Sequence, residues 1–293
     1  MACGKKTGTL YMTSSPRDTI AVANASTDTN LWYCRLGHMS EKGMKILLSK
    51  GKLPELKSID FDICESCILG KQKNVSFLKT GRTPKAEKLE LVHTNLWGPF
   101  PVASLRGSRY YITFINNSNR KVWVYFLKNK SDVFETFKKW KAMVEIETGL
   151  KVKCLRSDNG REYIDGGFNE YCAAQGIRME NTILGTPQQN GVAEHMNRTL
   201  NRSMWLHAGL PKTFWADAVK TVAYLINRGP SIPMEFRFPE EVWSGKEINF
   251  SHLKVLCCVS YVHIDFDARS KLDAKSKIYF FIDYGDEKFG YRF

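Results

Sequence analysis

Two acidic residues stand where they could hold divalent cations. Asp158 lies in the segment 156–160, directly after a strand-like run, and Glu194 lies in the first turns of a predicted helix. An acid in a turn at the end of a strand can hold a metal ion above a sheet edge, although Asp-Asn-Gly is also an ordinary turn sequence. The helix side that carries Glu194 could equally be a solvated face, because its other members are polar: Asn190, Asn197, Arg198 and Asn201.

A second group of residues is typical of a zinc site. Cys64-x-x-Cys67 begins 26 positions after His38. Thiolate sulfur and imidazole nitrogen are the usual ligands of tetrahedral zinc, so this combination predicts zinc binding. Cys34 lies four residues before His38, and in a helix the two side chains would share one face. Cys34 is therefore a candidate fourth ligand, and the alternative is an ordinary helix residue beside a weaker site.

The composition of the chain favours a nucleic-acid partner. Its 293 residues include 43 Lys and Arg against 30 Asp and Glu, which gives a formal net charge of +13. An excess of positive charge suits a polyanion such as DNA, although many basic proteins are simply soluble. Apolar side chains make up 43% of the chain, which is enough for a packed core and disfavours disorder.

The start of the chain and its eight cysteines indicate a reducing compartment. The first residues lack the apolar segment of a secretory signal, and no apolar run approaches the roughly 18 residues of a membrane span. We therefore expect a nuclear or cytoplasmic protein with no membrane partner, whose thiols are free or bound to metal.

The elements that must position the candidate residues follow from hydrophobic periodicity. Segments rich in β-branched and aromatic residues predict strands at 91–96, 110–115 and 122–127. Helical periodicity follows at 131–147, 167–175, 188–206 and 212–227, with short strands at 151–155 and 177–181. This order predicts an α/β fold, with a mixed sheet flanked by helices. Residues 31–50 are predicted to be helical, and 255–264 is the clearest strand after residue 240.

The sequence around the two acids resembles the integrases of copia-type retrotransposons. Thirty-five residues separate Asp158 from Glu194, as they separate the second and third acids of the D,D-35-E integrase motif. The flanking words Ser-Asp-Asn-Gly and Thr-Pro-Gln-Gln-Asn-Gly-Val-Ala-Glu are very similar to those of the family, and the resemblance runs from about Leu10 to the last residue. It implies an RNase H-like catalytic core, with a mixed five-stranded sheet and flanking helices, preceded by a small helical zinc-binding (GAG-pre-integrase) domain.

The resemblance also implies a domain organisation and partners. We expect an N-terminal extension at 1–30, the zinc-binding domain at 31–72, a basic linker at 73–88, the catalytic core at 89–245 and a truncated β-rich segment at 246–293. The expected partners are DNA, both element ends and target, and further copies of the chain in a homo-oligomer. Candidate phosphate contacts are basic residues of the linker region and of the Glu194 helix: Lys71, Lys73, Arg198 and Arg202.

The family chemistry depends on three carboxylates, of which this chain keeps two. By resemblance they would hold two Mg²⁺ or Mn²⁺ ions, one activating a water or a DNA 3′-hydroxyl and the other stabilising the leaving oxygen. The first acid belongs to a segment like His-Thr-Asp-Leu-Trp-Gly-Pro, where this chain has Asn95. An amide oxygen can coordinate a cation but brings no negative charge, and the amide NH₂ cannot bind metal. We therefore predict that strand transfer and 3′-processing are absent or very weak, so whether the chain is an enzyme stays open.

Other positions depart from the family in the same manner. Tyr33 replaces the first histidine of the expected His-His-Cys-Cys set, so only His38, Cys64 and Cys67 carry over and Cys34 stays a possible substitute. Asn95 and Tyr33 are each one transition mutation from the family residue, which is the basis of our hypothesis of a degenerate copy. Three alternatives remain: an active integrase fragment, a non-enzymatic relic that folds and binds DNA, and a poorly folded pseudogene product.

Overall fold

The structure is a computed structural model. It describes residues 5–7, 10–12, 29–53, 56, 58–59, 67, 87–158, 160–164, 167–181, 191–205, 211–264, 270, 273–285 and 290–293. Cys64, Lys71, Lys73 and the expected linker up to residue 86 lie outside the described residues. In the part of the chain that is described, no helix is long and apolar enough to cross a membrane.

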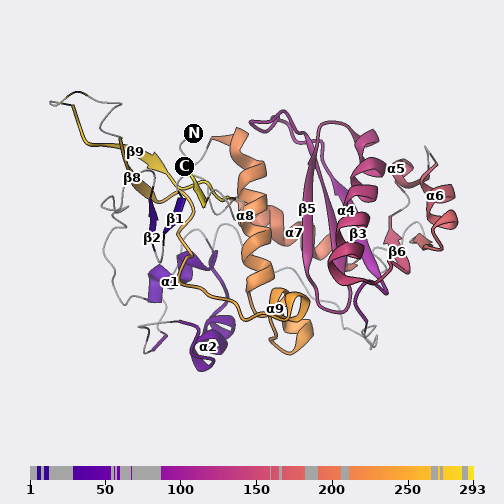
Figure 1. Ribbon diagram of the computed structural model, residues 1–293, viewed down its shortest axis with the longest axis horizontal. Helices are drawn as coiled ribbons and strands as arrows, with labels where there is room; N and C mark the ends of the chain where they lie inside the picture. The colour runs from indigo at the N-terminus through magenta and orange to yellow at the C-terminus, as the bar shows by residue number, and fades with distance from the viewer. Residues whose placement is uncertain are drawn as a thin grey trace.

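A mixed five-stranded sheet in the order β5-β4-β3-β6-β7 forms the centre of the molecule (Figure 1). The strands β3 (Val92–Trp97), β4 (Tyr110–Asn116) and β5 (Val122–Leu127) are antiparallel neighbours. The strand β6 (Cys154–Ser157) runs parallel to β3, and β7 (Arg178–Asn181) runs parallel to β6. The predicted mixed α/β sheet is therefore confirmed.

One face of the sheet is covered by α4 (Val133–Thr148), and the short helices α5 (Arg161–Ile164) and α6 (Phe168–Ala174) extend this layer. Phe137 and Trp140 of α4 are fully buried, and the Trp140 ring stacks on Phe114 of β4 with 4.4 Å between ring centroids. Gly149 ends α4 at φ 68°, a left-handed conformation that glycine adopts without steric cost. The spacing of apolar residues in α4 therefore gives the buried face that the sequence predicts.

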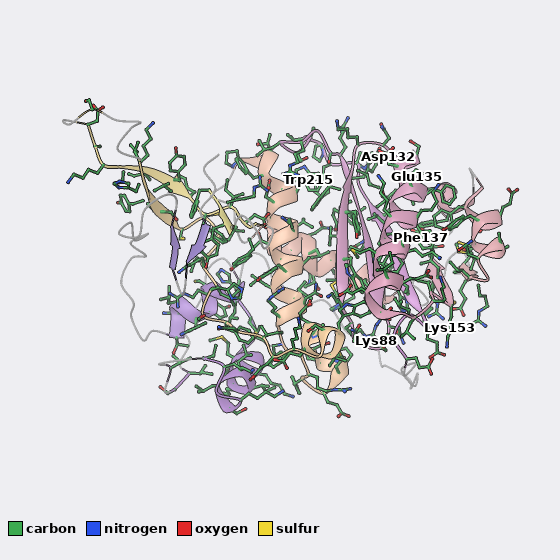
Figure 2. All side chains as sticks on the ribbon, viewed as in Figure 1. Lys88, Asp132, Glu135, Phe137, Lys153 and Trp215 are labelled. Atoms are coloured by element: carbon green, nitrogen blue, oxygen red, sulfur yellow. The ribbon has the colours of Figure 1, made fainter. Side chains whose placement is uncertain are left out.

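The opposite face is covered by α7 (Gly191–Trp205) and α8 (Trp215–Arg228). Their apolar side chains pack on the alternate residues of β4, of which Tyr111 and Ile115 are fully buried. Trp215 stacks on Phe100 with 3.9 Å between ring centroids. Figure 2 labels Phe137 on α4 and Trp215 at the start of α8, which belong to the clusters on the two faces of the sheet.

A third apolar cluster lies on the side of α8 away from the sheet and joins the two ends of the chain (Figure 1). The helices α1 (Thr29–Arg35) and α2 (Glu41–Ser49) contribute Trp32, Met44 and Leu47. The strands β10 (Asp283–Tyr284) and β11 (Tyr291–Arg292) contribute Tyr284 and Tyr291. The remaining elements are β1 (Lys5–Thr7), β2 (Leu10–Met12), α9 (Pro239–Ser244), β8 (Val259–His263), β9 (Ser276–Phe280) and three 3₁₀ turns (Lys130–Asp132, Lys212–Phe214 and Ile232–Met234).

Three local predictions need correction. The expected helix over 31–50 is two helices, because Gly37 and His38 adopt positive φ angles of 62° and 58° and the Ser40 hydroxyl then caps α2. The strand expected at 151–155 starts three residues later and ends two residues later, as β6. The strand expected at 255–264 is limited to β8, because Cys257 lies in a turn with φ 64°.

Candidate functional site

The pairing of two parallel strands brings Asn95 and Asp158 to neighbouring positions. His93 of β3 is the register partner of Arg156 of β6, and Asn95 and Asp158 each come two residues further along. Asn95 is buried, with 8% of its surface exposed. Its carbonyl oxygen accepts a hydrogen bond from the Thr113 hydroxyl of β4 at 3.3 Å. The asparagine is therefore held in the middle of the sheet beside the carboxylate.

The helix α7 directs two of its polar side chains, those of Asn197 and Asn201, to the sheet. Asn197 is fully buried, and its Oδ1 accepts a hydrogen bond from the Thr113 hydroxyl at 3.1 Å. One turn later, the Tyr111 hydroxyl donates to Asn201 Oδ1 at 3.0 Å. The alternative of a solvated helix face is wrong for these two residues. Glu194 lies about one turn before Asn197 and is half-buried, so α7 carries this carboxylate to the Asn95 side of the sheet.

The carboxylates of Glu162 and Glu194 act electrostatically on Asp158. Burial raises its pKa, and the negative charges of Glu162 and Glu194 raise it further. The backbone N–H of Gly160 donates to Asp158 Oδ1 at 3.3 Å, which acts in the opposite direction. An acid whose pKa is raised by neighbouring acids lies in a local excess of negative charge, which a bound cation would relieve.

Glu162 of α5 is a residue that the sequence analysis did not select. A Cβ atom at Gly160 would lie 2.6 Å from the Glu162 carboxyl group, so the glycine gives this carboxylate room beside the Asp158 turn. Tyr163 is buried on the same short helix, and its hydroxyl lies 3.1 Å from Thr94 Oγ1 on β3. The spacing of four positions from Asp158 is the signal that could have identified Glu162.

His93 stands between the candidate site and the β4–β5 turn. Its Nε2 lies 3.1 Å from Asn117 Oδ1, while Nδ1 is buried without a hydrogen-bond partner among the described residues. Burial is the main reason why its pKa falls to about 4, and the positive charges of Arg156 and Arg120 contribute. The imidazole is therefore neutral near pH 7 and adds no positive charge to the carboxylates.

The donor atoms of the site suit a hard divalent cation, but they are not gathered into a complete ligand set. Carboxylate and amide oxygens are the ligands that Mg²⁺ and Mn²⁺ prefer. Among the described residues, no three His, Cys, Asp or Glu side chains lie close enough together to hold a metal ion. The two negative charges of Asp158 and Glu194 would balance one dication, and Asn95 offers an oxygen without charge.

Two of the predicted nucleic-acid contacts can be placed. Arg198 is exposed on α7 and Arg202 is half-buried one turn later. No ion pair joins either guanidinium to another residue of the described chain. Both positive charges are therefore available on the helix that carries Glu194.

Two of the candidate zinc residues, His38 and Cys67, meet beside the turn that follows α1. Cys67 Sγ lies 3.5 Å from His38 Nδ1, which matches the roughly 3.6 Å between sulfur and nitrogen ligands of one tetrahedral zinc. The Tyr33 hydroxyl lies 2.7 Å from the same sulfur, and the Tyr33 ring meets the His38 ring edge-on at 5.0 Å. Tyr33 thus occupies the ligand side of this group, while Cys34 follows it on α1 and is half-buried.

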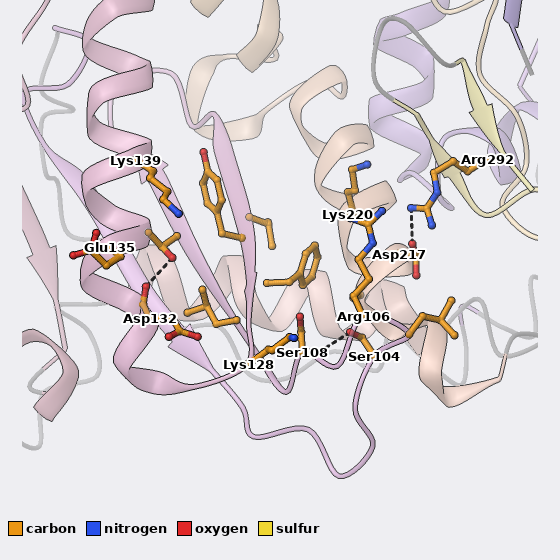
Figure 3. A pocket seen from close by; sticks show the side chains of 17 residues that line it. Ser104, Arg106, Ser108, Lys128, Asp132, Glu135, Lys139, Asp217, Lys220 and Arg292 are labelled. Carbon is orange, nitrogen blue, oxygen red and sulfur yellow. Dashed lines mark hydrogen bonds and ion pairs between the residues drawn. The ribbon is translucent and has the colours of Figure 1, made fainter. Parts of the chain in front are cut away.

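A groove of the described surface is separate from these residues. It has a volume of about 640 Å³ and lies over the edge strand β5 between α4 and α8 (Figure 3). Lys128, Lys139 and Lys220 line it together with Asp132 and Asp217. None of the candidate metal ligands borders this groove.

Comparison with known proteins identifies the family. The GAG-pre-integrase domain matches residues 9–72, and the retroviral polymerase SH3-like domain matches residues 258–293. The chain is 48% identical over 297 residues to the retrovirus-related Pol polyprotein from transposon TNT 1-94 of Nicotiana tabacum, covering 100% of this chain and 22% of that protein. The chain belongs to the integrase region of retrotransposon Pol polyproteins. The family expected from the acid spacing and flanking words is thereby confirmed.

Further relatives of this Pol region are more distant. The Pol polyproteins from transposons RE2 and RE1 of Arabidopsis thaliana are 32% identical over 257 residues and 30% identical over 289 residues, covering 86% and 96% of this chain. The chain spans about a fifth of the length of these curated relatives, at 22%, 17% and 19%. A chain of the simian T-cell lymphotropic virus intasome in complex with PP2A regulatory subunit B56 gamma has a TM-score of 0.47 and 12% identity, covering 73% of this chain and 74% of that chain.

Proposed function

We propose that this chain is an integrase-derived DNA-binding protein whose site for metal-dependent DNA strand transfer lacks one carboxylate. The observation that supports it is the meeting of Asn95, Asp158 and Glu194 at one place on the sheet. Two of the three positions keep an acid and the third is an amide. Loss of one negative charge weakens the binding of a second dication, and we expect DNA joining to be very slow.

The roles of the residues follow from their places. Asp158 and Glu194 would hold a divalent cation, which when bound supplies stabilisation of charge on phosphate oxygens. Asn95 would offer its amide oxygen to the same ion. The Thr113 hydroxyl lies 3.3 Å from Asn95 O and 3.1 Å from Asn197 Oδ1 and can donate its single proton to either, which links β3 and α7. Arg198 and Arg202 would bind DNA phosphates beside the site, and DNA-bound copies of the chain would assemble as a homo-oligomer.

The folded relic is a better account than a poorly folded pseudogene product. Trp140, Phe137 and Phe114 pack without exposure on one face of the sheet, and Tyr111 and Ile115 do so on the other. Such burial on both faces is what a stable core requires. DNA binding without catalysis is therefore the activity that we expect of the chain as it stands.

Strand transfer into target DNA tests the proposal. The wild-type chain and Asn95→Asp are compared with labelled element-end DNA in Mg²⁺ and in Mn²⁺. We expect joining only by Asn95→Asp, with a rate at least about 100-fold above the wild type, because removal of a catalytic metal ligand commonly costs a few kcal/mol. The double variant Asn95→Asp with Glu194→Gln is the inactive control.

Equal joining by the wild type and Asn95→Asp would contradict the proposal. In that case the variant Glu162→Gln shows whether the Glu162 carboxylate supplies the missing negative charge. If it does, this substitution in the wild-type chain abolishes DNA joining. Salt-dependent binding of duplex DNA by the wild type is the separate test of the DNA-binding part. No binding at 50 mM salt would refute that part.

A further inference from the structure

A second pocket lies where the N-terminal helices meet α7 and α8. Its volume is about 280 Å³, near the lower bound of about 300 Å³ for sites that take a small organic ligand. Met39, Met196 and Leu225 contribute apolar walls. Three hydroxyl side chains also border it, those of Ser40, Thr199 and Ser231. Arg120 is the one Lys or Arg among the described residues that line it, His38 also borders it, and none of those residues is acidic.

Among the described residues, the guanidinium of Arg120 has no hydrogen-bond acceptor. Burial lowers the pKa of its guanidinium, and no hydrogen bond or ion pair joins that group to any other residue of the described chain. An exposed arginine without a partner costs little free energy, because water solvates it. A guanidinium that has lost most of its water and has no hydrogen-bond partner costs much more. An anion that enters the pocket would supply the missing acceptors.

The turn that carries Arg120 is held in a fixed shape. Asn119 Oδ1 accepts from Asn116 Nδ2 at 2.7 Å and from the Lys121 backbone N–H at 3.2 Å, and Asn116 and Asn119 are fully buried. Arg120 itself has φ 59°, and its N–H donates to Asn116 O at 2.9 Å. The guanidinium therefore lines the pocket from a preorganised turn, which lowers the entropy lost when a ligand binds.

The pocket and the candidate strand-transfer site share the helix α7 but lie on different sides of it. Met196 and Thr199 border the pocket, and Glu194 lies two residues before Met196, about 200° around the helix. On the sheet, the Arg120 guanidinium is close enough to His93 to lower the pKa of that imidazole, and His93 lies two residues before Asn95 on β3. An unpaired strand that runs from the carboxylates along β3 would approach Arg120 and the pocket.

Resting on the proposed DNA binding, we infer that this pocket takes one unpaired nucleotide of a DNA end, with its phosphate on Arg120 and its sugar and base on the apolar walls. The planar fork of a guanidinium matches the oxygens of a phosphate. A recess of this size admits a single nucleotide but not a duplex. Methionine and leucine side chains suit a sugar and base of any sequence, so the site selects single-stranded character and not sequence.

Fluorescence anisotropy with a labelled ten-nucleotide single strand and a blunt duplex tests the inference. Arg120→Gln should weaken single-strand binding by about tenfold or more, because it removes charge-assisted hydrogen bonds. Arg106→Gln is the matched control, since Arg106 is exposed and lines the separate groove over β5. For the duplex, both variants should lower the binding affinity by the same small factor, about twofold. Thymidine 5′-monophosphate should displace the strand at lower concentration than inorganic phosphate.

Equal losses of single-strand binding for Arg120→Gln and Arg106→Gln would overturn the inference, while salt-dependent duplex binding would leave the proposed function standing. Binding of neither DNA by the wild type would refute the proposed function itself. Arg120→Lys covers the case of a misfolded glutamine variant. It keeps the charge but loses the fork, and an affinity equal to the wild type would also overturn the inference.

Discussion

Tyr33 shows how one residue can change a metal site without changing its surroundings. Its hydroxyl lies 2.7 Å from Cys67 Sγ, and the same sulfur lies 3.5 Å from His38 Nδ1. A neutral phenol is a poor ligand for zinc beside thiolates and imidazole. The zinc site that the family resemblance implies would therefore have a hydrogen-bonding residue where a ligand is expected.

We predict that Tyr33→His increases zinc affinity by about 100-fold or more, because it supplies a fourth strong ligand. Competition with a chelating dye measures the affinity. Tyr33→Phe is the control, since it removes the hydroxyl without adding a ligand. If Cys34 already completes the site, Tyr33→His will gain little and Cys34→Ala will lose zinc, and our view of Tyr33 would be wrong.

Cys172 of α6 is a buried thiol that we expect to make the free energy of unfolding depend on pH in the alkaline range. It is fully buried, and burial raises its pKa to about 11. The folded state therefore keeps its proton more tightly than the unfolded state, whose thiol has the ordinary value near 9. The free energy of unfolding should be unaffected by this group below about pH 9 and should fall as the pH rises toward about 11.

Urea unfolding at pH 8 and pH 10.5 tests this prediction. The loss of stability between the two values should be smaller in Cys172→Ala than in the wild type. Ala174→Gly on the same helix is a control that weakens α6 without removing a titrating group. An equal loss in the wild type and in Cys172→Ala would show that the thiol does not couple to folding.

Some residue environments could be predicted from the sequence and others could not. The spacing of Asp158 and Glu194, with their flanking words, selected residues that the fold brings to one place. The same local pattern assigned Asn197 to a polar helix face that could be solvated, yet Asn197 is buried. Its partner comes from another segment, the Thr113 hydroxyl of β4. A periodicity argument contains no information about such long-range pairs.

At the scale of elements, α8 acts as a partner for the edge strand β5. The Asn227 side chain accepts from the Val122 N–H and donates to the Val122 carbonyl, both at 2.8 Å. This is the pair of bonds that a neighbouring strand would make. The exposed end of the sheet is thereby joined to the helix that also contacts the C-terminal strands.

We predict that Asn227→Ala lowers the free energy of unfolding by about 2–4 kcal/mol, because two buried backbone groups lose their partners. Chemical denaturation measures the change. Asn249→Ala is the matched control, since Asn249 is exposed and makes one hydrogen bond to Ser251 N. A loss no larger than that of Asn249→Ala would contradict this role of the asparagine.

The elements themselves could largely be predicted, but their boundaries depend on features that periodicity does not contain. The helix break at Gly37 and His38 follows from two consecutive residues with positive φ, and a histidine rarely signals that conformation. The single turn α5 was missed because four residues are too short to show a helical period. It carries Glu162 and Tyr163, so the part of the site that it forms was missed as well.

For the whole molecule, the third apolar cluster has the largest consequence. It contains Met44 and Leu47 of α2 together with Phe281 and Tyr291 near the end of the chain. The buried Asp283 carboxylate adds ion pairs, because its Oδ2 lies 2.5 Å from Nζ of the partly exposed Lys220 of α8 and 3.4 Å from Arg292 Nη1. The segments expected as separate N- and C-terminal units therefore share one core, which their sequences could not reveal.

We predict that Phe281→Ala destabilises the protein by about 3–5 kcal/mol and raises hydrogen exchange in α2 as well as in β10 and β11. Phe281 is 1% exposed and belongs to the shared cluster. Its neighbour Phe280 is 50% exposed, so Phe280→Ala is a matched control with little expected effect. Exchange that rises only in the C-terminal strands would show that the two ends fold independently.

The most direct test of the central claim counts the manganese ions that the strand-transfer site binds. Electron paramagnetic resonance titration with Mn²⁺ is carried out on the wild type, on Asn95→Asp and on Asn95→Asp combined with Asp158→Asn. We predict that Asn95→Asp binds one ion more than the wild type, or binds Mn²⁺ at least about tenfold more tightly, and that the second substitution cancels the gain. Equal Mn²⁺ stoichiometry and affinity in the wild type and in Asn95→Asp would contradict the claim that one missing carboxylate separates this site from a complete one.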